Sequence, residues 1–88
     1  MGTEPTVFIV DDDEAVRQSL QLLAESVGLK AKCFAHPHEF LDKYDPSLPG
    51  CVVLDIRMPG MSGLELQTKL NERNIDLPVI FLTGHGDV

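Results

Sequence analysis

The sequence is poor in basic residues. Its 88 residues contain 7 Lys and Arg against 14 Asp and Glu, a formal net charge of -7. Nucleic acid phosphates and anionic lipid headgroups repel a chain of this charge. We therefore expect no direct nucleic acid binding, and instead a site for a cation or a surface for a basic partner.

Cysteines and long apolar runs are also scarce. The two cysteines, Cys33 and Cys51, lack the spacing of metal ligands. We expect them to be small buried hydrophobic residues in a reducing compartment, which predicts a cytoplasmic protein. No apolar run is long enough to span a bilayer, and no linker or repeat divides the chain, so residues 1–88 are expected to form one domain without membrane contact.

The sequence does contain a regular alternation of two apolar patterns. Four short apolar runs are expected to be strands, the last two buried on both faces: residues 6–10, 31–34, 51–55 and 79–82. Between them, three helices are indicated by an apolar stripe (Val16, Leu20, Leu23 and Val27), by Pro37 as a first helical residue, and by Ser62 as a cap. This alternation predicts an α/β fold whose parallel strands are joined by right-handed crossovers.

Polar side chains stand where three of these strands end. Asp11 and Asp12 follow the first strand, Asp55 ends the third, and Thr83 follows the fourth. The carboxyl ends of parallel strands lie on one edge of a sheet, so these groups should meet. Clustered carboxylates repel one another unless a cation lies among them, and oxygen ligands favour Mg2+. An ionised Asp55 beside such an ion is a candidate nucleophile toward a phosphoryl group, to which Thr83 could donate a hydrogen bond.

Three stretches together resemble a response-regulator receiver domain, and the last two resemble its FixJ-type branch: residues 10–14 (VDDDE), 54–63 (LDIRMPGMSG) and 82–87 (LTGHGD). The resemblance covers nearly the whole chain, with the stretches in the right order. It implies a flavodoxin-like (CheY-like), doubly wound parallel sheet with strand order 2-1-3-4.

The resemblance also implies roles for individual residues. Asp55 would be the phospho-acceptor, supplied by a sensor histidine kinase. Asp11, Asp12 and Asp55 would hold Mg2+ together with the backbone carbonyl of Arg57, and Thr83 would be the switch hydroxyl. A DNA-binding output domain outside this chain would control transcription. Such a domain assists only its own phosphorylation and dephosphorylation, so it is not an enzyme acting on a separate substrate.

The chain departs from the family after its fourth strand. Family members continue with a fifth strand, flanking helices and a Lys-Pro pair, whereas here no Lys follows residue 82. We therefore expect a C-terminally incomplete receiver domain. Its fourth strand would be an apolar outer strand, open to homodimer formation or strand exchange between copies.

Two other functions are compatible with the sequence. A structural or interaction fragment (a pseudo-receiver) would associate without phosphotransfer, and the missing Lys favours it. A small Mg2+-dependent phosphatase would need a general acid or base and a substrate pocket. The second Asp that phosphatases of the haloacid dehalogenase type carry shortly after the nucleophile is absent after Asp55.

Overall fold

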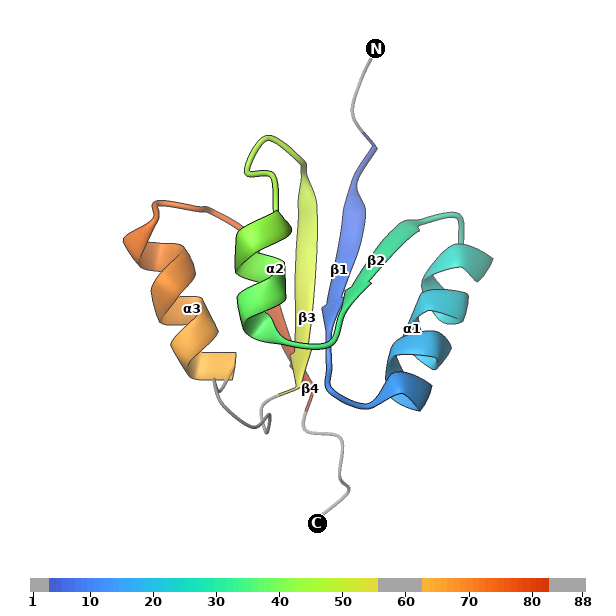
Figure 1. Cartoon of the computed structure of the whole chain (residues 1–88). Helices are drawn as coiled ribbons and strands as arrows, with labels where there is room; N and C mark the ends of the chain where they lie inside the picture. The colour runs from blue at the N-terminus through green and yellow to red at the C-terminus, as the bar shows by residue number, and fades with distance from the viewer. Residues whose placement is uncertain (1–3, 56–62, 83–88) are drawn as a thin grey trace.

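Strands and helices alternate throughout the described chain. The structure, a computed structural model, describes residues 4–55 and 63–82. Its elements are β1 (Thr6–Val10), α1 (Glu14–Ser26), β2 (Lys30–Phe34), α2 (Pro37–Lys43), β3 (Gly50–Asp55), α3 (Gly63–Glu72) and β4 (Val79–Leu82). The four strands form one parallel sheet in the order β2-β1-β3-β4, which confirms the expected fold class and strand order (Figure 1).

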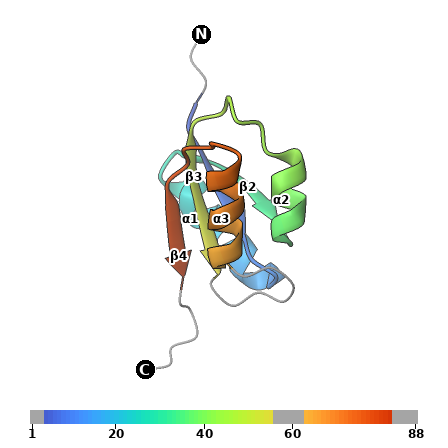
Figure 2. The same cartoon turned by 90° about the vertical axis from the view of Figure 1, so that its left-hand side faces the viewer.

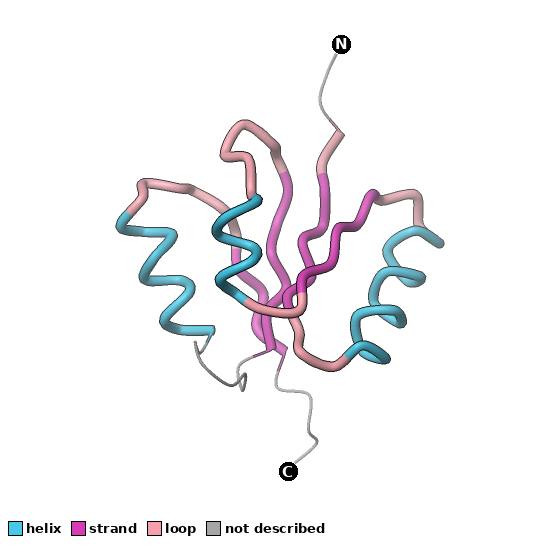
Figure 3. Tube along the Cα trace, in the orientation of Figure 1, coloured by secondary structure: helices cyan, strands magenta, loops and turns pink. Residues whose placement is uncertain are grey.

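Helices lie on both faces of this sheet. α1 packs mainly against β1 and β2 on one face, while α2 and α3 lie on the other (Figures 1 and 2). The tube in Figure 3 shows the same three layers, with the strands between the helices. Right-handed crossovers produce this division, because the chain moves outward from β1 to β2 and then returns past β1 to β3. The Ser62 cap expected for α3 lies outside the described residues.

The main core lies between the sheet and the layer formed by α2 and α3. Its buried members are Phe8, Val10, Phe34, Phe40, Leu41, Val52, Leu54, Leu66, Leu70 and Leu77. Phe40 is central, with its ring centroid 5.7 Å from that of Phe8, 5.4 Å from Phe34 and 5.1 Å from Tyr44. Edge-on and offset ring pairs of this kind stabilise a core beyond the area that they bury. The core therefore holds the central strands β1 and β3 firmly against α2.

Apolar side chains on α1 and on β4 are more exposed than the sequence predicts. In the expected stripe, Leu23 is 62% exposed and Val27, just past the end of α1, is 67% exposed. The expectation that the fourth strand is buried on both faces is wrong, since Ile80 is 49% exposed. The reason is that β4 is an outer strand, whereas α1 lies mainly over β1 and β2. The expectation of an apolar outer strand is confirmed.

The cysteines agree only in part with the expectation of burial. Cys33 and Cys51 are both half-buried, and both are free of disulfide bonds. The Cys33 thiol donates to the carbonyl oxygen of Arg17 at 3.8 Å. In the part of the chain that the structure describes, no helix has the length and apolar character needed to cross a membrane.

Candidate functional site

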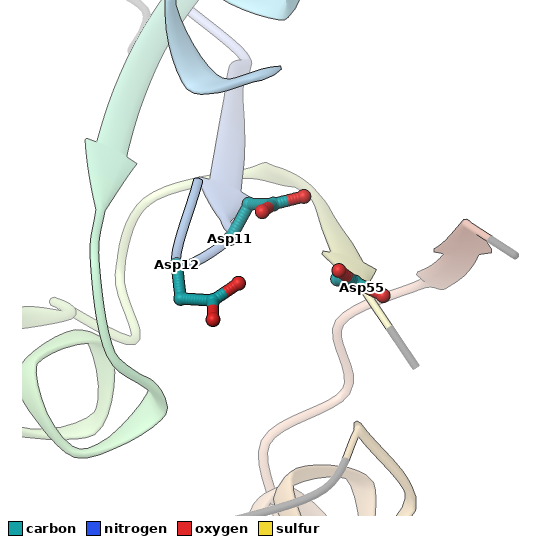
Figure 4. Close-up of side chains that lie close together, drawn as sticks. All are labelled: Asp11, Asp12 and Asp55. Atoms are coloured by element: carbon teal, nitrogen blue, oxygen red, sulfur yellow. The ribbon is translucent and has the colours of Figure 1, made fainter. Parts of the chain in front are cut away.

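Three carboxylates meet at the C-terminal edge of the sheet. β1 and β3 are parallel neighbours, and Val10 is the register partner of Leu54. The residues that follow this pair, Asp11 after Val10 and Asp55 after Leu54, therefore lie side by side. Asp12 is the next residue after Asp11. One carboxylate oxygen from each of these three residues lies within 4.8 Å of the other two. Figure 4 shows the three side chains around one common space.

The three carboxylates differ in their exposure. Asp11 is 3% exposed and Asp55 is 6% exposed, whereas Asp12 is open to solvent. Asp11 and Asp55 come directly after Val10 and Leu54, which are fully buried in the core. Two of the acids are therefore held in place by packed strands, and the third leaves the site accessible from the surface.

Hydrogen bonds define the turn between β1 and α1. The backbone N–H of Asp11 donates to the carbonyl oxygen of Phe34 at 3.2 Å, and the Asp11 side chain accepts from the N–H of Asp13 at 2.9 Å. Asp13 is the N-cap of α1, and its carboxylate accepts from the N–H of Ala15 at 2.9 Å and from that of Val16 at 3.4 Å. The three consecutive aspartates thus have three separate roles, because one is buried, one is exposed and one caps a helix.

Burial and negatively charged neighbours dominate the electrostatics of Asp11. Burial raises the pKa of the Asp11 carboxyl above its ordinary value. The hydrogen bond from the N–H of Asp13 opposes this rise, and the negative charges of Asp55, Asp12 and Asp13 add to it. A cation among these groups would remove both the repulsion and the cost of keeping Asp11 ionised.

The donor set fits a hard divalent cation. The cluster found among the described residues consists of three carboxylates and contains neither His nor Cys. Carboxylate oxygens suit Mg2+ better than they suit the softer transition metals, and Mg2+ is usually bound by one or two carboxylates with several waters retained. The exposed position of Asp12 leaves room for such waters.

The structure therefore brings together three of the five residues predicted for the site. The other two, Arg57 and Thr83, lie outside the described residues. Leu82, which precedes Thr83 in the sequence, is the register partner of Asp55.

Sequence reasoning missed two residues next to this site. It gave Asp13 no role of its own, although Asp is a preferred N-cap and Val16 begins the apolar stripe three residues later. It did not single out Arg17, whose Nη1 donates to the backbone carbonyl of Asp11 at 2.8 Å. The spacing of four between Asp13 and Arg17 puts the Arg one turn into the helix, which was the available signal.

Fold and site together define a doubly wound parallel α/β domain with clustered carboxylates at the carboxyl edge of its sheet. Residues 7–88 match a family described as the response regulator receiver domain. The chain belongs to this family, which is that of the receiver domains of two-component response regulators.

Curated relatives resemble the chain over nearly its whole length. The transcriptional regulatory protein FixJ of Azorhizobium caulinodans is 51% identical over 82 residues, which are 93% of this chain and 39% of FixJ. The response regulator protein TmoT of Ectopseudomonas mendocina is 47% identical over 85 residues, 97% of this chain and 39% of TmoT. The chain thus spans about two fifths of the length of these relatives.

Solved structures of response regulators share the fold. StyR superposes with a TM-score of 0.91 at 46% identity, over 98% of this chain and 43% of StyR. TrrA of Thermotoga maritima, solved in complex with Mg2+ and BeF, superposes with a TM-score of 0.82 at 29% identity, over 93% of this chain and 71% of TrrA. TrrA has also been solved in complex with the histidine kinase ThkA.

Proposed function

We propose that this chain is a phospho-accepting receiver domain that takes a phosphoryl group from a sensor histidine kinase onto Asp55. The observation that carries the proposal is the convergence of Asp11, Asp12 and Asp55 within 4.8 Å at the edge where β1 and β3 end. Asp55 is the only one of the three that belongs to a strand, and its rigid position supports its assignment as the acceptor.

The chemistry needs little from the protein beyond position and charge. A carboxylate oxygen of Asp55 forms the new bond to phosphorus, and the bond from phosphorus to the donor breaks. When the donor is a phosphohistidine, the imidazole nitrogen leaves with the bonding electron pair and then takes up a proton. A carboxylate nucleophile carries no proton that must be removed, so this step requires no general base.

Asp11, Asp12 and Asp55 would hold Mg2+, with the backbone carbonyl of Arg57 as a further ligand. The bound ion would neutralise negative charge that develops on the phosphoryl oxygens. We further propose Thr83 as the switch hydroxyl, which would donate a hydrogen bond to a phosphoryl oxygen. Both roles rest on the family resemblance.

The output and the setting are also proposals. FixJ is a transcriptional regulatory protein, and this chain covers 39% of it. We propose that the phosphorylation state of this chain controls a DNA-binding domain of the same kind, in the cytoplasm. The receiver itself would assist its own phosphorylation and dephosphorylation.

The test is the intact mass of the chain after incubation with acetyl phosphate and MgCl2. We expect one added phosphoryl group, lost in Asp55→Asn and in the absence of MgCl2. The matched control is Asp42→Asn, which makes the same chemical change at an exposed site on α2 and should leave the addition intact. No addition to the wild-type chain, or equal addition to Asp55→Asn, would contradict the proposal.

A second function is favoured by the outer strand β4. Ile80 is half-exposed, and β4 has a free hydrogen-bonding edge among the described elements. The chain could then act as an interaction module that associates with a second copy, with or without phosphotransfer. Association and phosphorylation are measured separately, so either can fail alone.

A further inference from the structure

We infer that Arg17 is a positioning residue of the acidic site, an inference that rests on the Mg2+ site of the proposed function. By holding the backbone carbonyl of Asp11, Arg17 would keep the carboxylates of Asp11 and Asp12 in the arrangement that takes a divalent cation. It would touch neither the ion nor the phosphoryl group.

The contact is short and specific. Arg17 is half-buried on α1, and its Nη1 donates to the carbonyl oxygen of Asp11 at 2.8 Å. A hydrogen bond from a charged donor at this distance is stronger than one between neutral groups. Arg17 forms no ion pair with a carboxylate in the described part of the chain. The guanidinium therefore fixes the backbone and leaves the carboxylates available.

This carbonyl controls how the two acids are presented. It belongs to the peptide group that joins Asp11 to Asp12, so holding it restricts the orientation of both residues. Asp11 has further anchors in the carbonyl of Phe34 and the N–H of Asp13. Asp12 is exposed, and no hydrogen bond to its side chain is found among the described residues. The direction in which its carboxylate points thus depends on the backbone that Arg17 holds.

Charge and position predict opposite effects of losing Arg17. A guanidinium near a cation site repels the cation, so removing only its charge should strengthen Mg2+ binding. Loss of positioning should weaken binding, since groups that orient metal ligands contribute about tenfold or more to metal affinity. The sign of the change in Mg2+ affinity therefore distinguishes a positioning role of Arg17 from a purely electrostatic effect.

The experiment is calorimetric titration of the 88-residue chain with MgCl2, with urea unfolding in parallel. The variants are Arg17→Gln, Arg17→Lys and Arg73→Gln. Arg73 is the matched control, because its Nη1 donates to the carbonyl of Leu41 at 3.4 Å. Arg73 follows the C-terminal end of α3. That end of the helix lies near the N-terminal ends of the strands, away from the C-terminal end of β3 where Asp55 lies (Figure 1).

We expect Arg17→Gln to bind Mg2+ about tenfold more weakly than the wild type. Arg17→Lys, which keeps a charged donor, should recover the affinity to within about threefold. Arg73→Gln carries the same change in net charge and should bind Mg2+ as the wild type does, whatever stability it loses.

Equal or tighter binding by Arg17→Gln would overturn the role of Arg17 and leave the proposed function standing. A wild-type chain that binds no Mg2+ would overturn both. If Arg17→Gln does not fold, Arg17→Met keeps the apolar stem and replaces it in the titration. Failure of both variants to fold would show that Arg17 is a structural residue, which also contradicts the inference.

Discussion

Asp11 is the residue at which the demands of stability and of the site conflict. It is almost fully buried, and three other aspartates surround it. Burial and these neighbours raise its pKa in the folded state. A raised carboxyl pKa means that the folded state binds the proton more tightly than the unfolded state does. The stabilisation that protonated Asp11 gives the fold is complete below the carboxyl pKa of the unfolded chain, about 3.9. It is lost as the pH rises through the higher pKa of the folded chain.

We therefore expect Asp11→Asn to raise the urea midpoint of the metal-free chain at pH 7. Asn can still accept the hydrogen bond from the N–H of Asp13, but it carries no charge to bury. The same substitution should remove the stabilisation that MgCl2 confers on the wild type, because a ligand that binds only the folded state raises stability.

Asp42→Asn is the comparison for this prediction, since it removes an exposed carboxylate of α2. It should change neither the urea midpoint appreciably nor the effect of MgCl2. A lower midpoint for metal-free Asp11→Asn would show that the buried carboxylate stabilises the fold, contrary to our reading.

β3 begins where its backbone lies close against that of β1. Gly50 is the register partner of Thr6 and has a φ of +147°, and a Cβ built on it would overlap the carbonyl oxygen of Thr6. Gly28, after α1, also has a positive φ, of +84°, but a Cβ there would meet no atom within 4 Å. A side chain at Gly28 would therefore be opposed by backbone conformation alone, whereas a side chain at Gly50 would be opposed by both conformation and steric overlap.

We expect Gly50→Ala to destabilise the chain by about 3 kcal/mol or more, because strained conformation and steric overlap both oppose the new methyl group. Gly28→Ala should cost only about 1–2 kcal/mol, the usual cost of a left-handed conformation. Urea unfolding of both variants measures the difference. Equal losses would mean that the start of β3 moves away from β1 easily, and Asp55 would then be held less firmly than the structure indicates.

The whole sheet has two unlike edges. Lys30 and Lys32 are exposed on the outer strand β2, and edge lysines discourage pairing with another chain. β4, at the other edge, has the sequence Val-Ile-Phe-Leu and carries no charge. Net charge opposes association, since each copy carries -7. We expect association through β4 to strengthen as salt screens this repulsion.

Light scattering across a concentration series should detect this association. Ile80→Lys, which places a charge on β4, is expected to shift the mass toward that of the monomer. Leu22→Lys makes the same change in net charge at an exposed position of α1 and should leave the association unchanged. A monomer at every concentration and salt, or equal effects of the two variants, would rule out β4 as the interface.

Local sequence patterns were enough to predict the order of strands and helices and the meeting of three aspartates. Short apolar runs predict strands and 3.6-residue spacing predicts helices, and both are read from neighbouring residues, so the element order could be derived directly. The meeting of Asp11, Asp12 and Asp55 was also predictable, because each follows or ends a strand and parallel strands end at one edge. The strand order came from the family resemblance, since spacing alone does not choose among neighbours.

Tertiary structure decided what depends on contacts between distant segments. Leu23 and Ile80 are as apolar as the buried core residues, yet both are exposed. Ile80 is exposed because α1 covers mainly β1 and β2 and leaves β4 open. The raised pKa of Asp11 follows from burial and from Asp55, a residue on another strand. The bond from Arg17 to the carbonyl of Asp11 spans only six residues, but it forms across the turn that joins β1 to α1, whose shape no periodicity predicts. Periodicity assigns residues to elements, whereas exposure, pKa and hydrogen-bond partners arise only when those elements pack.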